Sequence, residues 1–158
     1  MGTYPIFRWW IAAVGLLALP AWGQETSHRV ITDPRESARP AAMQILKHLA
    51  KGEIEAAAAL SNAPQRRLEV LRDFERTVGA EHFRRVFGRY FAPQNKVVLE
   101  AGIGKHRLLV WDLGEAGNHL SGQYFVEVDG RFVMDDVPSP TRTQLQRVLE
   151  AQRKNLAK

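Results

Sequence analysis

The stretch from Gln123 to Val137, QYFVEVDGRFVMDDV, decides the fold class of this chain. It contains two runs of aromatic and β-branched residues on either side of Asp129-Gly130. An Asp-Gly pair between two such runs is typical of the two-residue turn of a β-hairpin. The stretch therefore predicts two antiparallel strands, at 120–128 and 131–137.

The register of this hairpin places apolar side chains on both faces of the sheet. Pairing across the turn puts Val126 opposite Val133 on one face and Phe125 opposite Met134 on the other. A sheet with one face in water alternates apolar and polar residues more regularly than this. We therefore expect the second face to be covered by another element of the chain or by a second copy, which would form a homodimer through the sheet.

The same period of two continues upstream as far as Pro93. It predicts further strands at 96–101 and 106–113, with glycines between them marking a turn. The expected sheet thus has about four antiparallel strands.

Before Pro93 the apolar residues recur at steps of three and four, which predicts helices. Asp33-Pro34-Arg35-Glu36 combines the N-cap carboxylate, the proline and the glutamate of a capping box, so the first helix is expected to begin there. The expected helices are 33–50, 53–60 and a third region that Gly79 interrupts, over 65–78 and 81–90.

Helices followed by antiparallel strands are the order of an α+β protein. We expect three N-terminal helices packed on the sheet, and an added C-terminal helix over 141–155 with Leu145 and Leu149 on its apolar stripe. The expected domain, 33–158, is large enough to bury a core without disulfides, and the chain has no cysteine. Thiol catalysis and thiolate metal sites are therefore excluded.

The first residues have the layout of a secretory signal peptide. Arg8 precedes an uninterrupted apolar run from Trp9 to Leu19, and small residues stand in Ala21-Trp22-Gly23 before a cleavage position. The run is about half of the roughly 20 residues that cross a bilayer. We expect cleavage of residues 1–23, a periplasmic or secreted product with a flexible lead-in over 24–32, and no stable membrane insertion after cleavage. The alternative is an uncleaved N-terminal anchor.

The chain is basic, with 22 Lys and Arg against 17 Asp and Glu and a formal net charge of +5. Loss of residues 1–23 takes away Arg8 and no acidic residue, which lowers the charge to +4. A basic domain can bind nucleic acid. Export favours an anionic envelope surface, or a solvated basic face, over nucleic acid as the reason for this charge.

Two segments are similar to segments of a known family. They are the helix junction LAKGEIEAA at 49–57 and the hairpin at 123–137, and together they resemble the nuclear transport factor 2-like superfamily over residues 34–138. The resemblance implies three helices packed on a strongly curved sheet, forming a cone with an internal pocket. The helix junction also resembles tetratricopeptide repeats, but these need several stacked copies, and strands follow here instead.

Four aromatic residues are the candidates for contacts with a ligand in such a pocket. Phe87 and Tyr90 end the third helical region one turn apart, while Trp111 and Tyr124 stand in strands. Each offers a broad surface, and all but Phe87 carry a polar group as well. The alternative is that all four fill the core.

Enzymes of this superfamily, such as ketosteroid isomerase and scytalone dehydratase, hold acid-base groups in the cone. The isomerase uses an aspartate base with a tyrosine and a protonated aspartic acid as its oxyanion hole. The chain contains such ingredients, but they do not match the enzyme motif residue by residue. These ingredients are Tyr90, Tyr124, Asp112, His106 and Asp135.

Other chemistries find less support in the sequence. The five histidines form no i, i+4 pair and no metallohydrolase motif. The side chains of Asp135 and Asp136 are expected to point to opposite faces of a strand and not to share an ion. We therefore expect no catalytic residue, metal or cofactor, and a domain that holds a small apolar ligand or an envelope protein in or on the cone. The alternative is a lyase or isomerase that uses a carboxylate and a tyrosine.

Overall fold

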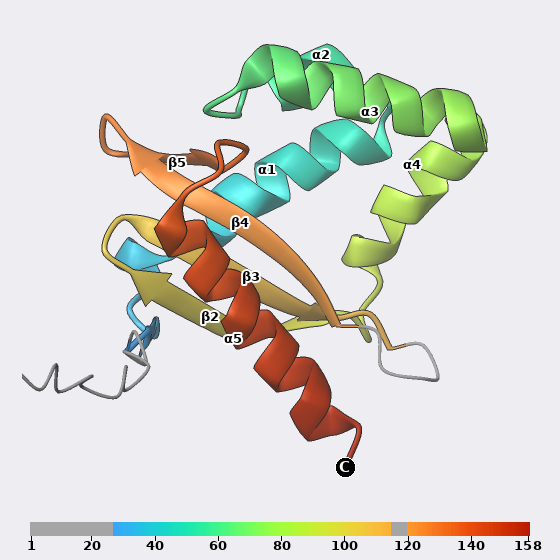
Figure 1. Cartoon of the computed structure of the whole chain (residues 1–158). Helices are drawn as coiled ribbons and strands as arrows, with labels where there is room; N and C mark the ends of the chain where they lie inside the picture. The colour runs from blue at the N-terminus through green and yellow to red at the C-terminus, as the bar shows by residue number, and fades with distance from the viewer. Residues whose placement is uncertain (1–26, 115–119) are drawn as a thin grey trace, which may run out of the picture.

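The computed structural model describes residues 27–114 and 120–158 and places helices on both faces of one sheet (Figure 1). The predicted signal peptide, over 1–23, lies outside the described residues. The α-helices are α1 (Arg39–Ala50), α2 (Ile54–Ala58), α3 (Pro64–Val78), α4 (Ala80–Gly88) and α5 (Pro140–Leu156). Two 3-10 turns are η1 (Pro34–Glu36) and η2 (Arg89–Phe91). The strands are β1 (Arg29–Val30), β2 (Lys96–Ile103), β3 (His106–Asp112), β4 (Leu120–Val128) and β5 (Arg131–Met134).

The α+β class is confirmed, and the structure corrects its finer description in two respects. In the described ranges the sheet has five antiparallel strands in chain order, instead of about four. The added strand is β1, which lies inside the predicted lead-in at 24–32 and pairs with β2. Before the strand β2, the described residues form four α-helices instead of three, because Gly79, at a φ of +86°, separates α3 from α4.

The turn and the register of the predicted hairpin are confirmed, but its second strand ends at Met134 instead of Val137. Val128 pairs with Arg131 and Phe125 with Met134. Asp129 and Gly130 have φ angles of +51° and +76°, the conformation that a two-residue hairpin turn requires.

The first helix begins later than the capping box predicts. Asp33 caps only the short turn η1, which ends at the extended residue Ser37, and α1 begins at Arg39 with Ala38 as its N-cap. At this point the backbone N–H of Ala38 donates to the carboxylate of Glu100 in β2, at 2.7 Å. A side chain of the sheet thus fixes the start of α1, and a local sequence pattern cannot reveal such a distant partner.

The main core lies between the sheet and the helices α1–α4. Apolar side chains of β3 and β4 face those of α1, and Phe83 of α4 is completely buried among them. Its ring lies 5.6 Å from that of Phe74 and 4.8 Å from that of Phe87, measured between centroids. This part of the interior is therefore filled by the chain itself.

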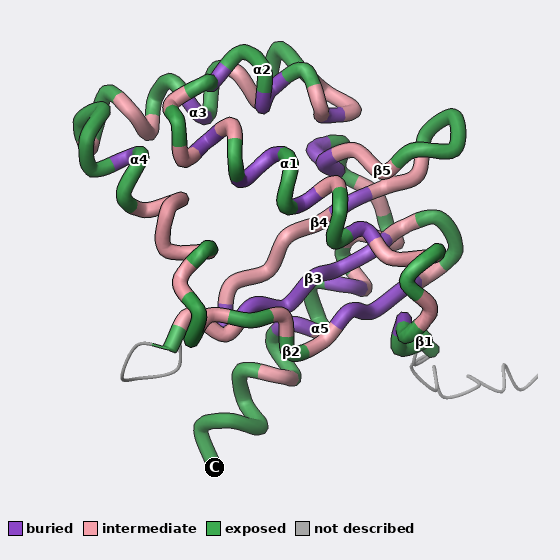
Figure 2. Tube along the Cα trace, turned by 180° about the vertical axis from the view of Figure 1, so that it is seen from behind, coloured by how far each residue is buried: buried purple, intermediate pink, exposed green. Residues whose placement is uncertain are grey.

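The helix α5 covers the opposite face of the sheet. Of the two alternatives expected from the sequence, another element of the chain or a second copy, the first is therefore present. Leu145 and Leu149 of α5 pack on the outward-facing apolar residues of β3. Figure 2 shows β3 buried along most of its length, because it has cover on both faces.

Candidate ligand-binding groove

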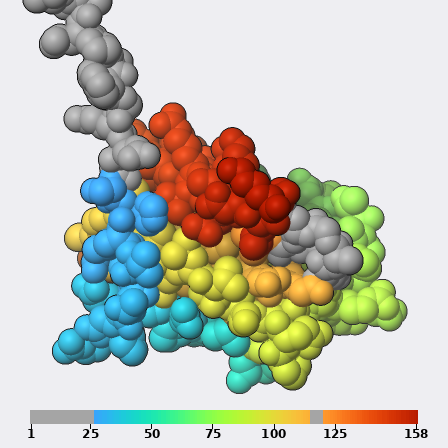
Figure 3. Space-filling model, turned by 90° about the horizontal axis from the view of Figure 1, so that it is seen from below, coloured from blue at the N-terminus to red at the C-terminus, as the bar shows by residue number. Residues whose placement is uncertain are grey.

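A groove of about 370 Å³ opens where η2 leads into β2. Its walls come from the first turns of α1, from η2 and the loop after it, and from β2 and β3. Figure 3 shows β2 at the surface between α5 and the beginning of α1. Small-molecule sites occupy roughly 300–1,000 Å³ and are lined mainly by apolar and aromatic side chains. The lining residues here are Arg39, Met43, Tyr90, Phe91, Ala92, Pro93, Asn95, Val97 and Trp111.

Tyr90 and Trp111 form the aromatic floor of the groove. Their rings meet edge to face, with centroids 5.2 Å apart and planes at 84°. The Tyr90 hydroxyl hydrogen-bonds with Ser121 at 2.8 Å, and Trp111 Nε1 donates to Gln123 Oε1 at 2.9 Å. Both polar atoms are thus satisfied from β4, which fixes the rings. Trp111 is only 4% exposed, so the apolar surface that these two rings offer comes mainly from the half-buried Tyr90.

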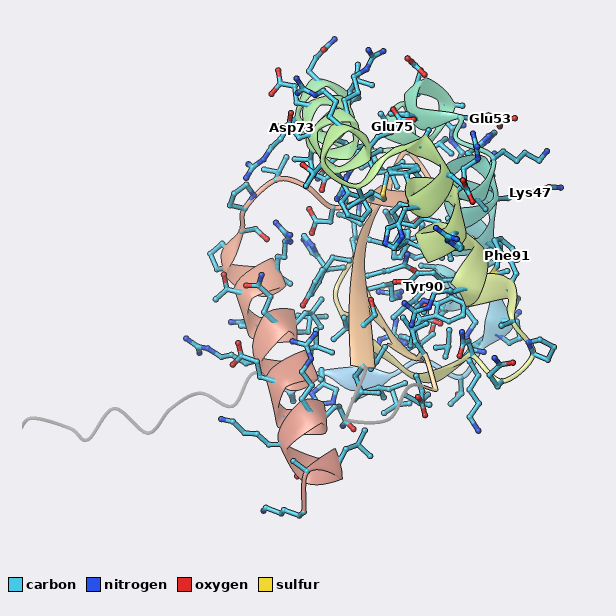
Figure 4. All side chains as sticks on the ribbon, turned by 90° about the vertical axis from the view of Figure 1, so that its right-hand side faces the viewer. Lys47, Glu53, Asp73, Glu75, Tyr90 and Phe91 are labelled. Atoms are coloured by element: carbon cyan, nitrogen blue, oxygen red, sulfur yellow. The ribbon has the colours of Figure 1, made fainter. Side chains whose placement is uncertain are left out.

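Phe91 and Met43 border the groove as exposed apolar side chains. Phe91 comes from η2 and is 43% exposed, while Met43 comes from α1 and is 37% exposed. Figure 4 places Tyr90 and Phe91 together at the lower end of the α4–η2 segment, away from Asp73 at the opposite end of the helical layer. Exposed apolar surface beside a hollow gives a ligand contact area whose removal from water is favourable.

Arg39 is the only charged residue among the described residues that line the groove. Its side chain is 53% exposed, and its Nε lies 3.6 Å from Oε2 of Glu100, too far for a good hydrogen bond. The Glu100 side chain is only 1% exposed. Its carboxylate accepts from the Ser37 hydroxyl at 2.6 Å as well as from the Ala38 N–H. The carboxylate is therefore held by two neutral donors in addition to Arg39.

The structure brings together two of the four aromatic residues predicted from the sequence. Tyr90 and Trp111 meet in the groove, whereas Phe87 packs against Phe74 and Phe83 and belongs to the filled core. The sequence-based expectation of one pocket shared by all four residues thus does not describe their arrangement.

Tyr124 lies on the other face of the sheet, beneath α5. Trp111 is paired with Ser121, and Tyr124 is three positions further along β4, so its side chain points the opposite way. The guanidinium of Arg142 lies 5.2 Å from the centroid of the Tyr124 ring. Burial raises the pKa of the Tyr124 phenol, an effect that nearby arginines partly oppose.

Sequence reasoning missed the other walls of the groove. Arg39 and Met43 are four residues apart on α1 and so share one helical face, which the helical period alone could have shown. Phe91 comes directly after the predicted helix, which ends at Tyr90. In the structure both residues lie in the 3-10 turn η2, and Phe91 borders the same groove. No local pattern indicates that α1 meets this turn.

Two of the acid-base ingredients, His106 and Asp135, lie outside the groove in a cluster that we call the polar clasp. It joins the turn before α3 to the end of β5 and consists of Ser61, Asn62, Arg67, His106, Asp135 and Asp136. Asp136 accepts from the Ser61 hydroxyl at 2.5 Å and from Arg67 Nε at 2.9 Å. Asp135 bonds with Asn62 Nδ2 at 3.0 Å and with His106 Nδ1 at 2.9 Å. The members of the clasp bond with one another, which is the pattern of a structural link.

Among the described residues, neither Tyr90 nor Tyr124 hydrogen-bonds to a carboxylate. The Tyr90 hydroxyl bonds with Ser121, and the buried carboxylates are bound by the donors given above. Across 27–114 and 120–158, no three potential metal ligands come close enough to hold one ion. The arrangement required for isomerase-type chemistry is therefore not assembled from these groups.

Comparison of the chain with family models, with curated proteins and with solved structures gave no match. In the described part of the chain, no helix combines the length and the apolar character needed to cross a membrane.

Proposed function

We propose that this chain is an exported binding domain of the nuclear transport factor 2-like superfamily, and that it holds a small ligand with an apolar body in the groove. The observation that carries the proposal is the groove itself, in which exposed Phe91 and Met43 border a fixed aromatic floor. The order of helices before an antiparallel sheet supports the family assignment. The signal-peptide layout of residues 1–23 supports export.

The lining of the groove favours binding over acid-base catalysis. A catalytic acid or base must reach the substrate with a proton to give or take. Within the described ranges no carboxylate or histidine lines this groove, and the Tyr90 hydroxyl is already engaged with Ser121. Its size and mainly apolar walls favour a small ligand over a protein partner.

The test is a titration with the neutral apolar dye N-phenyl-1-naphthylamine, whose emission rises when it leaves water. Phe91→Ala removes an exposed wall of the groove. We expect it to weaken dye binding about fivefold, since full burial of an aromatic side chain contributes ~1.5–3 kcal/mol and Phe91 has 43% of its surface left for a ligand to cover. Val70→Ala is the matched control, because Val70 is 52% exposed on α3 and does not line the groove. Equal weakening by both variants, or dye emission that does not rise at all, would count against the groove as a ligand site.

A further inference from the structure

We propose that the ligand of this groove is an organic monoanion, with an apolar or aromatic body and a carboxylate that pairs with Arg39. This inference rests on the proposed function and adds the chemical class of the ligand. It predicts a preference between two molecules of the same shape that differ only in charge.

The first argument is the environment of Arg39. Its guanidinium carries five N–H donors in a planar fork that matches a carboxylate. In the described part of the chain its ion-pair partner is Glu100, at 3.6 Å from Nε. Glu100 also accepts hydrogen bonds from Ser37 and Ala38 at shorter distances, and its charge interacts with the Arg107 guanidinium as well. The carboxylate therefore stays hydrogen-bonded when Arg39 turns toward a ligand.

The second argument is the order of groups along the groove. Arg39 is the first residue of α1, and Met43 follows one turn later on the same face. The partial positive charge at this helix end is already met by the carboxylate of Glu100, so the attraction for a further anion comes from the Arg39 guanidinium. A ligand lying along α1 would thus place its charged group at Arg39 and its apolar body beside Met43, over the aromatic floor.

The third argument is the balance of charge. The buried carboxylate of Glu100 faces its donors, whereas the Arg39 side chain is 53% exposed, so the groove presents a cation to solvent. A cationic ligand would be repelled by Arg39. A neutral ligand without an acceptor at this position would leave the N–H groups of Arg39 hydrogen-bonded to water. A single arginine matches a single negative charge.

The experiment compares 2-naphthoate with its neutral isostere 2-naphthamide by calorimetric titration of the full chain. The variants are Arg39→Gln, Arg39→Lys and the control Arg85→Gln, which changes the net charge equally at an exposed position on α4. A thermal melt of each variant first establishes that it is folded. The lysine variant keeps the charge and tests whether the guanidinium fork contributes as well.

We expect the wild-type chain to bind naphthoate about tenfold more tightly than naphthamide, the size typical of a charge-assisted hydrogen bond. Arg39→Gln should abolish this preference and leave the affinity for naphthamide within about twofold, whereas Arg85→Gln should behave as the wild type. Arg39→Lys should keep part of the preference.

Equal affinities for the two probes in the wild-type chain would overturn the anion assignment, as would a preference that survives in Arg39→Gln. Either result leaves the proposed function standing if the neutral dye still distinguishes Phe91→Ala from Val70→Ala. Failure of both probes to bind, together with failure of the dye test, would overturn the proposed function as well.

Discussion

The close approach of α5 to the sheet can be tested at Gly122. A Cβ placed on this residue would lie 2.5 Å from Leu149 Cδ2 and 3.2 Å from Leu108 Cδ1, so the Leu149 methyl would have to move by roughly 1 Å to reach ordinary contact. Overpacking of this kind costs ~1–3 kcal/mol. The loss of glycine freedom in the unfolded chain returns ~0.4–1 kcal/mol, so Gly122→Ala should lower the free energy of unfolding by about 1–2 kcal/mol.

A double-mutant cycle identifies the contact responsible. Leu149 is 6% exposed, and Leu149→Ala alone should cost ~2–5 kcal/mol, because it leaves a cavity. In the double variant the alanine methyl at position 122 occupies part of that cavity and no longer meets the Leu149 methyl, so that only the milder contact with Leu108 remains. The combined loss should therefore be smaller than the sum of the single losses by about 1–2 kcal/mol.

The assay is urea denaturation of the four proteins, with Gly88→Ala as a control. Gly88 ends α4 with a φ of −62°, and a methyl group placed on it would have no atom within 4 Å, so alanine there should stabilise by ~0.5–1 kcal/mol. Full additivity of the two losses, or a Gly122→Ala variant as stable as the wild type, would refute this packing of α5 on the sheet.

Four further predictions concern other parts of the molecule. Phe83→Ala should cost ~3–5 kcal/mol in urea denaturation, because Phe83 is fully buried, whereas Phe91→Ala, at the groove border, should cost under about 1 kcal/mol; similar losses would show that Phe91 belongs to the core. Asp136→Ala should cost about 3 kcal/mol in the same assay, because it leaves Arg67 and Ser61 without their partner in the polar clasp; a loss under about 1 kcal/mol would show that the clasp is loose. Burial raises the pKa of Tyr124 in the folded state, so its contribution to stability is complete below the unfolded-state pKa of about 10 and declines as the pH rises above it; Tyr124→Phe should lessen that decline in pH-dependent melts, and an unchanged decline would contradict this assignment. Amino-terminal sequencing of protein recovered from the periplasm or medium should begin at Gln24, and an intact Met1 on membrane-bound protein would reverse the export proposal.

The sequence predicted those elements that local chemistry specifies. The Asp129-Gly130 pair has only a few compatible turn geometries, so the hairpin and its register followed directly. The helices α2, α3 and α4 begin and end close to the predicted positions, because glycine and proline punctuate them. Elements specified by distant partners were missed or misplaced. The strand β1 is too short to show a period, and α1 begins where Glu100, some 62 residues away, receives the N–H of Ala38.

The candidate site was only partly predictable, because the sheet is buried on both faces. In a sheet with one wet face, the polar residues of each strand show which side points inward. Five consecutive residues of β3, from Arg107 to Trp111, are buried, so neither set of alternate side chains is marked as outward. The sequence therefore could not show that Trp111 and Tyr124 point to opposite sides, although it did show that both are large aromatic residues in strands.

The same two-sided burial explains why the groove lies at one end of the sheet. The helix α5 closes the outer face, and the aromatic rings of α3 and α4 fill the space above the middle of the inner face. Where α4 gives way to η2, the exposed side chains of Phe91 and Met43 line the groove together with the half-buried Tyr90, while Trp111 is only 4% exposed. A ligand bound at this point would cover apolar side chains that the described residues leave exposed. Arg39 is the one charged group among the described residues that line the groove, so its charge would select among ligands.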